Sequence, residues 1–251
     1  MKNTGILRIQ AFGARQSSPI EGVLVTVSGN GFTAQRITDE TGTAADLSIE
    51  APSCALSLQE DNTIRPYAVV DLTAAKAGFR TVRIQGVQIF AGQVTLAQPE
   101  MIPETEEDRD VVNPPIVIPE HSLFTGDGGS GPDPMENCVP RVLDRVIIPK
   151  NITVHLGKPA ASARNVTVSF RDYIANVASS EVYPTWPEQA LRANIHCQIS
   201  LALNRIYTEW YPSKGYTFNI TNSTSYDQYY VHGRTVFDEV GGQAVLGRQL
   251  M

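Results

Sequence analysis

Apolar and polar residues alternate along several short segments of the first hundred positions. This spacing puts successive side chains on opposite faces and is typical of half-buried β-strands. Glu40, Thr41 and Gly42 form a turn signal between two of the segments. The alternating segments are ILRIQAF (6–12), GVLVTVSG (22–29), FTAQRITD (32–39), YAVVDLTAAKAGF (67–79), TVRIQGVQIF (81–90) and QVTLAQPEMIP (93–103). Short strands separated by glycine-bearing turns predict an all-β sandwich over residues 1–100.

The spacing changes to a helical period after Ser169. Ser169 is followed three residues later by Asp172, which is the spacing of a capping box. Apolar residues then recur at intervals of three and four, at Phe170, Tyr173, Ile174 and Val177. Because Pro184 cannot continue a helix, we expect this helix to end near Ser180.

A second and longer helix is predicted directly afterwards. Thr185 and Glu188 form another capping-box spacing, and Pro187 is tolerated in a first turn. Pro212 and Gly215 stop the helix, which predicts a length of roughly 35–40 Å. The expected apolar stripe is Leu191, Ile195, Ile199, Ala202, Ile206 and Trp210. Polar residues interrupt the segment too often for a membrane span.

Three ranges follow from these patterns, and together they predict a multidomain chain. Residues 1–100 form the β-sandwich. Residues 101–145 are acidic and rich in Pro and Gly, so we expect a linker that cannot fold alone, with apolar patches at 116–124 that dock on a neighbour. Residues 146–251 form an α+β domain with a two-helix core, opened by a hairpin of 146–157 and 163–170.

Composition excludes some functions. The 251 residues carry a net charge of −6, which argues against nucleic-acid binding driven by phosphate attraction. Cys54, Cys138 and Cys197 lie far apart and have no metal-type spacing, so we expect three free thiols. The N-terminal segment shows neither a secretory signal nor a span, and the localisation stays open.

Glu181 is the candidate for chemistry. It is expected just past the first helix, where the negative end of the helix dipole disfavours a carboxylate. Burial against Tyr183 and Trp186 would also raise its pKa, toward that of a group able to donate a proton near neutral pH. The residue chemistry alone favours a different interpretation, in which Glu181 is a solvated residue in a turn between two helices.

The segment from Ile147 to Gly233 resembles the SpoIID/LytB family of bacterial proteins, which act on or bind peptidoglycan. The family pattern joins an aromatic residue, a short helix, a Glu, a Pro- or Trp-bearing loop and a second helix. The residues that match it are Tyr173, Val177, Glu181, Trp186, Ala190, Leu191, Arg192 and Ala193. A second, shorter element, Asp/Cys-Gln-x-Tyr-x-Gly, is similar to Tyr226, Asp227, Gln228, Tyr229 and Gly233.

The resemblance implies that Glu181 is the catalytic acid and base of a lytic transglycosylase, which cleaves the β-1,4 bond after N-acetylmuramic acid. It also implies a glycan groove whose candidate residues are Tyr183, Trp186, Tyr226, Asp227, Gln228 and Tyr229. Some members bind zinc through Cys and His, but Cys197 and His232 suggest no such site here. We expect no metal and no cofactor.

Two departures from the family favour an alternative. The family's Ala-Ala-Arg-Thr-Tyr run is replaced by residues 197–201, Cys-Gln-Ile-Ser-Leu. The family's strand-rich second half is not seen in VGGQAVLGRQLM, so a partial domain is expected. The alternative is a non-catalytic structural or glycan-binding protein, for example in a phage-tail-like particle. Whether the chain is an enzyme is left open between the two.

The N-terminal segment resembles carboxypeptidase regulatory-like domains, which are sandwiches of the transthyretin-like type. The residues that carry this resemblance are Pro19, Ile20, Gly22, Val23, Val25, Thr38, Asp39 and Gly42. Such modules act as spacers, stalks or adhesion units, which implies a protein partner for this part of the chain.

Overall fold

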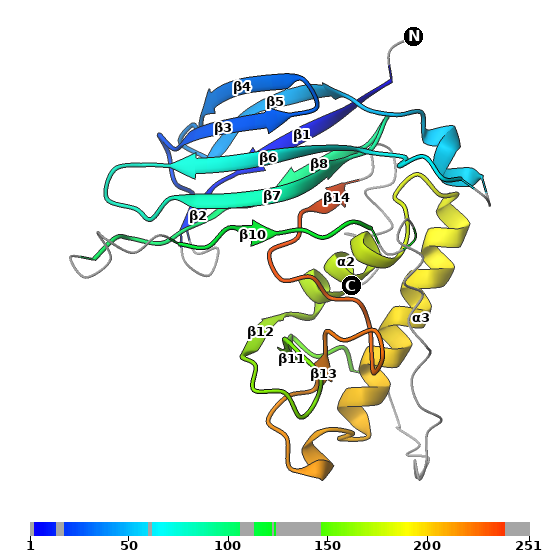
Figure 1. The fold of residues 1–251 in the computed structure, drawn as a ribbon. Coiled ribbons are helices and arrows are strands. Elements are labelled where there is room, and N and C mark those ends of the chain that lie inside the picture. The colour runs from blue at the N-terminus through cyan, green and yellow to red at the C-terminus, as the bar shows by residue number, and fades with distance from the viewer. Residues whose placement is uncertain are drawn as a thin grey trace. The chain divides into compact units, whose positions relative to one another are not determined.

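The computed structural model describes residues 3–13, 18–59, 62–105, 113–121, 123 and 147–238. These residues divide into two compact units (Figure 1). Unit 1 contains the described residues of 1–120 together with 233–238, and unit 2 contains those of 121–232. The described residues are mostly β, and the two α-helices whose bounds they define, α2 and α3, both lie in unit 2.

Unit 1 is a β-sandwich with two main sheets. The first sheet has the order β14 (Val236–Asp238), β8 (Val94–Ala97), β1 (Thr4–Gln10) and β5 (Thr43–Glu50). The second has the order β10 (Ile116–Val117), β7 (Val82–Ile89), β6 (Ala68–Ala75), β3 (Leu24–Gly29) and β4 (Phe32–Ile37). A short parallel pair, β2 (Phe12–Gly13) with β9 (Glu100–Met101), and a 3-10 helix, η2 (Cys54–Leu58), complete the unit.

The core of unit 1 lies between the two sheets. In β1, Leu7 and Ile9 are buried while the residues between and after them are only partly buried. In β6 the same alternation buries Val70 and Leu72, and both strands contribute to one apolar cluster. The alternation read from the sequence therefore predicts the inner faces of the sandwich correctly.

Three strands of unit 1 were not expected from the sequence. β5 pairs antiparallel with β1, although TAADLSIE shows no strict alternation. β10 falls in the range expected as a linker and pairs parallel with β7, which gives the apolar patch at 116–118 a partner. β14 comes from the range expected as the C-terminal domain and pairs antiparallel with β8. β10 and β14 have only two and three residues, which is too short to show a period. They form because a neighbouring strand offers backbone hydrogen-bonding groups. The domain boundaries stay a prediction.

The turn that carries the Thr-Asp-x-x-Gly motif is built around Asp39. Its Oδ1 accepts hydrogen bonds from Thr41 Oγ1 (2.6 Å), Thr41 N (2.9 Å) and Thr43 N (3.0 Å). The Thr41 hydroxyl and the Thr43 amide lower the pKa of this carboxyl. Gly42 follows with φ +72°, and a Cβ built there would lie 2.4 Å from the carbonyl oxygen of Ala11. The motif therefore needs glycine both for its backbone angle and for this close approach.

Replacing Gly42 with Ala is expected to lower the free energy of unfolding of unit 1 by about 2 kcal/mol or more, because strain and a backbone clash add. The matched control is Gly31→Ala, since Gly31 has φ +69° and no described atom within 4 Å of its built Cβ. Strain alone should cost the control about 1 kcal/mol. Thermal unfolding followed by circular dichroism measures both, and equal losses would show that the contact with Ala11 is unimportant.

Unit 2 packs two helices on a small sheet. β11 (Asn151–His155) and β12 (Asn165–Ser169) form the expected antiparallel hairpin, and β13 (Ile220–Thr221) pairs parallel with β11. α2 (Phe170–Glu181) follows directly, and the Ser169 side chain accepts the Asp172 amide, as the sequence predicts. α3 (Glu188–Tyr207) packs on α2, and a 3-10 helix, η4 (Pro212–Lys214), follows it. The shared apolar core takes residues from the sheet and from both helices.

The predicted start of α3 is wrong. The helix begins at Glu188 with Pro187 at its N-cap, and no side chain caps it. The reason is a turn before the helix, in which Trp186 N donates to Tyr183 O (3.1 Å). This turn takes up the residues around Thr185, and the Pro187 carbonyl accepts the first helical bonds from Ala190 and Leu191.

The apolar stripe of α3 is correct in its first half and wrong in its second. Leu191, Ile195, Ile199 and Ala202 are buried as predicted. Ile206 is only partly buried, and Trp210 lies beyond the end of the helix. Twenty residues give a helix of about 30 Å. Two polar residues, Gln198 and Arg205, are buried on the core side of the helix.

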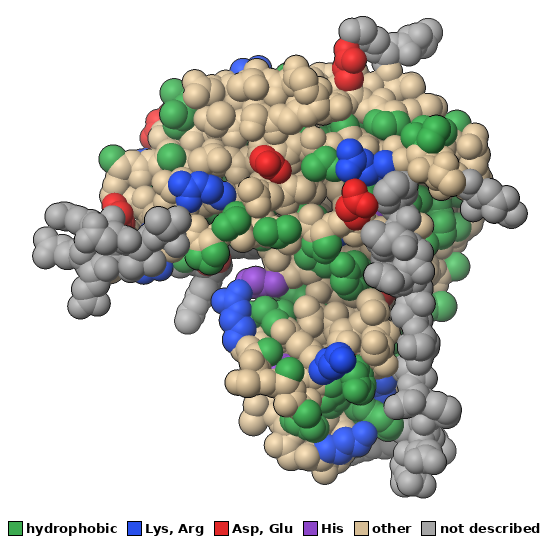
Figure 2. Space-filling view, viewed as in Figure 1, with side chains coloured by type: hydrophobic (Ala, Val, Ile, Leu, Met, Phe, Trp, Pro, Cys, Tyr) green, Lys and Arg blue, Asp and Glu red, His purple; other side chains and the backbone are tan. Residues whose placement is uncertain are grey.

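On the face seen in Figure 2, the described acidic and basic side chains are scattered and form no continuous patch of one sign. Within the described residues, neither helix is long and apolar enough to cross a membrane. Cys54 and Cys197 are exposed free thiols, and Cys138 lies outside the described residues.

Candidate functional site

Glu181 is the last residue of α2, and two donors hold its partly buried carboxylate. The backbone N–H of Tyr229 donates to Oε1 (2.8 Å), and Nε2 of Gln198 donates to Oε2 (2.8 Å). The first donor comes from the segment after β13 and the second from α3. Three segments therefore converge on one carboxyl group.

Burial raises the pKa of Glu181 above its ordinary value of 4.5. The two hydrogen bonds, from the Tyr229 amide and the Gln198 side chain, oppose the shift because they stabilise the charged form. The direction agrees with the expectation from the sequence. The cause is loss of water around the carboxyl group, and the helix dipole is not needed to explain it. Burial and the two fixed donors therefore act on this carboxyl group in opposite directions, and burial has the larger effect on its pKa.

The segment 226–231, which we call the site loop, is fastened to α2 by three side chains of that helix. Tyr173 donates its hydroxyl to Gln228 Oε1 (2.9 Å). Asn176 makes two hydrogen bonds to the backbone of Val231. Its Nδ2 donates to the Val231 carbonyl (2.8 Å), and its Oδ1 accepts from the Val231 N–H (2.9 Å). Together with Glu181, these contacts fix the loop backbone along the helix.

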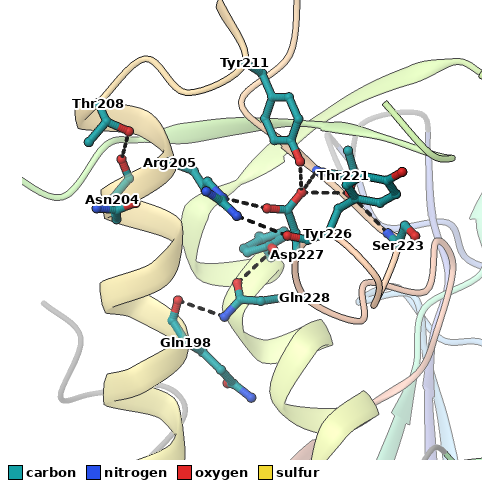
Figure 3. Close-up of polar contacts among 11 residues, drawn as sticks. Gln198, Asn204, Arg205, Thr208, Tyr211, Thr221, Ser223, Tyr226, Asp227 and Gln228 are labelled. Atoms are coloured by element: carbon teal, nitrogen blue, oxygen red, sulfur yellow. Dashed lines mark hydrogen bonds and ion pairs between the residues drawn. The ribbon is translucent and has the colours of Figure 1, made fainter. Parts of the chain in front are cut away.

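The site loop is also held from α3 through a buried ion pair (Figure 3). Nε of Arg205 lies 2.7 Å from Oδ1 of Asp227, and its Nη2 donates to the Tyr226 carbonyl (3.1 Å). Oδ2 of Asp227 accepts hydrogen bonds from the Tyr211 hydroxyl (2.5 Å), Thr221 N (2.9 Å) and Thr221 Oγ1 (2.7 Å). The Asp227 side chain has no exposure to solvent. Burial is the main cause that raises the pKa of Tyr211, and Asp227 raises it further. The Tyr211 hydroxyl therefore keeps its proton and acts as a donor.

Among the candidate residues, the structure brings Glu181, Gln228 and Tyr229 together. Gln228 is 4% exposed, and its Nε2 donates to the backbone carbonyl of Gln198 (3.0 Å). Asp227 lies in the buried network described above, so neither it nor Gln228 presents its side chain to solvent. Their visible role is to hold the site loop.

The candidate aromatic residues differ in exposure. Tyr183 is 7% exposed and meets Trp186 edge-on, with ring centroids 6.3 Å apart. Trp186 and Tyr229 are partly buried, and Tyr226 is 37% exposed. Tyr226 and Tyr229 flank the buried pair Asp227 and Gln228, and Tyr183 and Trp186 lie in the turn after Glu181.

Sequence reasoning missed Gln198, Arg205 and Asn176. Gln198 and Arg205 continue the buried face of α3, in the series 191, 195, 198, 202 and 205, whose steps are three or four. Polar residues in line with an apolar stripe were a signal, since buried polar groups need specific partners. Asn176 falls on α2 between predicted core positions and carried the same signal.

The described residues contain no group of three or more His, Cys, Asp or Glu side chains that could hold a metal ion. His232 and Cys197 belong to no such group.

No protein-family model matches the sequence, and no curated protein matches it. Among solved structures, the Bacillus anthracis TIE protein has 14% identity over 40% of this chain and 17% of its own, with a TM-score of 0.29. A 3-chlorocatechol 1,2-dioxygenase from Rhodococcus opacus has 13% identity over 41% of this chain and 61% of its own, with a TM-score of 0.29. A 5-hydroxyisourate hydrolase from Klebsiella pneumoniae has 20% identity over 40% of this chain and 94% of its own, with a TM-score of 0.24.

The chain thus spans less than two thirds of the length of the first two proteins. Their TM-scores are too low to assign a function. The class that the fold defines is a β-sandwich unit joined to a unit of two helices and a small sheet. The site defines a partly buried carboxyl group held by two donors.

Proposed function

We propose that this protein acts on the glycan strands of peptidoglycan, with residues 147–232 binding the strand and Glu181 transferring protons in lytic transglycosylation. The observation that carries the proposal is the carboxyl group of Glu181, held by Tyr229 N and Gln198 Nε2 with a pKa raised by burial. The motif residues that resemble the SpoIID/LytB family support the same assignment.

The reaction needs only one carboxyl group. In its neutral form, Glu181 gives its proton to the oxygen of the β-1,4 bond after N-acetylmuramic acid, and the bond from C1 to that oxygen breaks. The resulting carboxylate takes the proton of the sugar's own 6-hydroxyl, whose oxygen forms a new bond to C1. The product is an anhydro sugar, no water is consumed, and Glu181 ends neutral. Two-carboxylate hydrolases differ because their second carboxylate acts as the nucleophile or activates a water molecule.

The aromatic residues near Glu181 suit sugar binding. Tyr226 and Tyr229 on the site loop, and Trp186 after α2, keep part of their surface exposed. Aromatic faces with a polar edge are suited to partly apolar ligands such as sugar rings. Tyr183 is the most buried of the four and supports Trp186. Asp227 and Gln228 contribute by holding the loop that carries Tyr226 and Tyr229.

Unit 1 is proposed to be a carboxypeptidase regulatory-like module that serves as a spacer or attaches to a protein partner. Its support is the Asp39 turn, where the motif residues make the hydrogen bonds of a closed turn.

A non-catalytic glycan-binding or structural role is the second candidate, and one observation favours it. Both oxygens of Glu181 accept hydrogen bonds from the protein, so the residue also fastens the site loop to α2. In this role the hydrogen bonds of Glu181 would stabilise a binding domain, for example in a phage-tail-like particle, and Glu181 would not act as a catalyst.

Incubation of the full chain with purified sacculi separates the two functions. We expect soluble anhydromuropeptides, identified by their mass, which lacks one water relative to hydrolysis products. Sedimentation of the protein with sacculi, without release of products, would leave the binding role. Protein that neither sediments nor releases products would overturn both candidates.

A further inference from the structure

The side-chain amide of Gln198 makes hydrogen bonds through its nitrogen and none through its oxygen among the described residues. It is 3% exposed and lies on α3. Its Nε2 uses two hydrogens, one on Glu181 Oε2 (2.8 Å) and one on Asn194 Oδ1 (2.6 Å). Its Oε1 is buried and has no hydrogen-bond partner among the described residues. The amide therefore binds Glu181 while leaving its own carbonyl unsatisfied.

An unsatisfied buried carbonyl destabilises a fold, because the group loses water and gains no partner. An apolar side chain of the same length would avoid that loss and would continue the stripe of Ile195, Ile199 and Ala202. The reason for an amide here lies in its two donor contacts, of which the one with Asn194 stays within α3 and the one with Glu181 reaches the candidate site.

The geometry also fixes where the carboxyl group lies. Tyr229 N–H approaches Oε1 from the site loop, and Gln198 Nε2 approaches Oε2 from α3. With one donor on each oxygen, rotation of the carboxyl group about its last bond breaks a contact. Asn194, one turn earlier on α3, holds the second hydrogen of Gln198 and so fixes the orientation of the amide.

We propose that Gln198 is a positioning residue for Glu181, which orients the carboxylate through Oε2 and stabilises its charged form for the second proton transfer. This inference rests on the proposed function for its role in the reaction. Gln198 occupies a position where the family resemblance expects Ala, so the role belongs to this chain's own residues.

Tyr173 on α2 is the titratable group with a described electrostatic interaction with Glu181, and Tyr173 also interacts with Asp227 in the site loop. Burial raises the pKa of Tyr173 well above its ordinary value, and Asp227 is paired with Arg205. Gln198 is the side-chain donor that lowers the pKa of Glu181, alongside the Tyr229 amide.

The test compares wild type with Gln198→Met in the full chain, using side-chain ¹³C labels on glutamate and an NMR titration. We expect the titration midpoint of Glu181 to move to higher pH in Gln198→Met, because the donor that favours the charged form is gone. The matched control is Gln189→Met, at an exposed position in the first turn of α3, where the midpoint should not move. An unchanged midpoint in Gln198→Met would overturn the proposal.

Stability separates positioning from packing. Gln198→Met should stay folded at the temperature of the titration and unfold close to the wild-type midpoint in urea, since a buried unsatisfied carbonyl is removed together with its donor contacts. If Gln198→Met fails to fold, Asn194→Ala is the second variant. It leaves the Gln198 amide less firmly oriented, and the Glu181 midpoint should again rise. An unchanged midpoint there, in folded protein, also overturns the proposal.

Activity supplies the second readout. With each protein at the pH of its own fastest release, Gln198→Met should release anhydromuropeptides about tenfold more slowly, because its carboxyl group is no longer held in one orientation, with unchanged sedimentation on sacculi. Failure of the wild-type protein to release anhydromuropeptides would contradict the proposed function. The NMR titration midpoints of Glu181 would still support or overturn the contact between Gln198 and Glu181. The two failures are therefore distinguishable.

Discussion

Replacing Glu181 with Gln is expected to lower the rate of anhydromuropeptide release from sacculi at least about a hundredfold. Gln keeps the size of the side chain and cannot give or take the proton. The carboxyl group is the only proton donor that the proposed reaction uses at the glycosidic oxygen, so both steps lose it. Release is measured by mass spectrometry of soluble products, at equal amounts of sacculus-bound protein.

The matched control for this experiment is Glu188→Gln. Glu188 lies in the first turn of α3, is exposed and pairs with Arg192 at 2.6 Å. Its loss removes one carboxylate of the same unit without touching the site, so release should stay within about twofold of wild type. Equal release by wild type and Glu181→Gln, with both folded, would contradict the catalytic role and leave the fastening role of Glu181.

The pH dependence follows from the raised pKa. The folded protein binds a proton at Glu181 up to a higher pH than the unfolded chain does. The stabilising contribution of Glu181 is therefore fully present below its ordinary value of 4.5 and is lost as pH rises through the folded pKa. Because bond cleavage needs the neutral acid, release should fall over the same rise in pH. A release rate that increases steadily across that range would contradict an acid role.

Replacing Arg205 with Met is expected to lower the free energy of unfolding of unit 2 by about 3–5 kcal/mol. The substitution leaves Asp227, whose side chain has no exposure, charged inside the protein without its ion-pair partner. The remaining donors, Tyr211 and Thr221, are neutral and cannot balance the charge. Urea unfolding of the full chain measures the loss, followed by tryptophan fluorescence, since Trp186 and Trp210 both lie in unit 2.

A surface ion pair on the same helix is the matched control. Arg192→Met breaks the exposed pair with Glu188 and should cost about 0–1 kcal/mol, because water screens the charges. The double variant Arg205→Met with Asp227→Asn should recover part of the stability, as it removes the unpaired charge. A loss for Arg205→Met no larger than for Arg192→Met would show that the buried pair does not hold the site loop.

Local patterns predicted most elements correctly where neighbouring residues decide the structure. The Ser169 cap and the spacing of Tyr173, Ile174 and Val177 predicted α2 nearly to its ends. Alternation predicted β1 and β6 with their buried faces. The hairpin of β11 and β12 is likewise visible in the sequence.

The errors fall where residues distant in the chain decide. β14 is a strand because the edge of β8 offers its backbone groups as partners, and Phe237 packs edge-on against Phe90 at 5.2 Å. Three residues show no period that could predict this. The capping-box spacing of Thr185 and Glu188 predicted a helix capped by Thr185. The turn between Tyr183 and Trp186 takes up Thr185, so the helix begins at Glu188.

The sequence by itself determined the alternating strands, the two helices and the place of Glu181 at the end of the first. These follow from the period of apolar residues and from capping, both of which act over a few neighbouring positions. Only the tertiary structure decided what surrounds the carboxyl group. Gln198 and the Tyr229 amide meet Glu181 across 17 and 48 positions of the chain, and the Arg205–Asp227 pair spans 22. Such contacts depend on how helices and loop pack together, which no local pattern encodes.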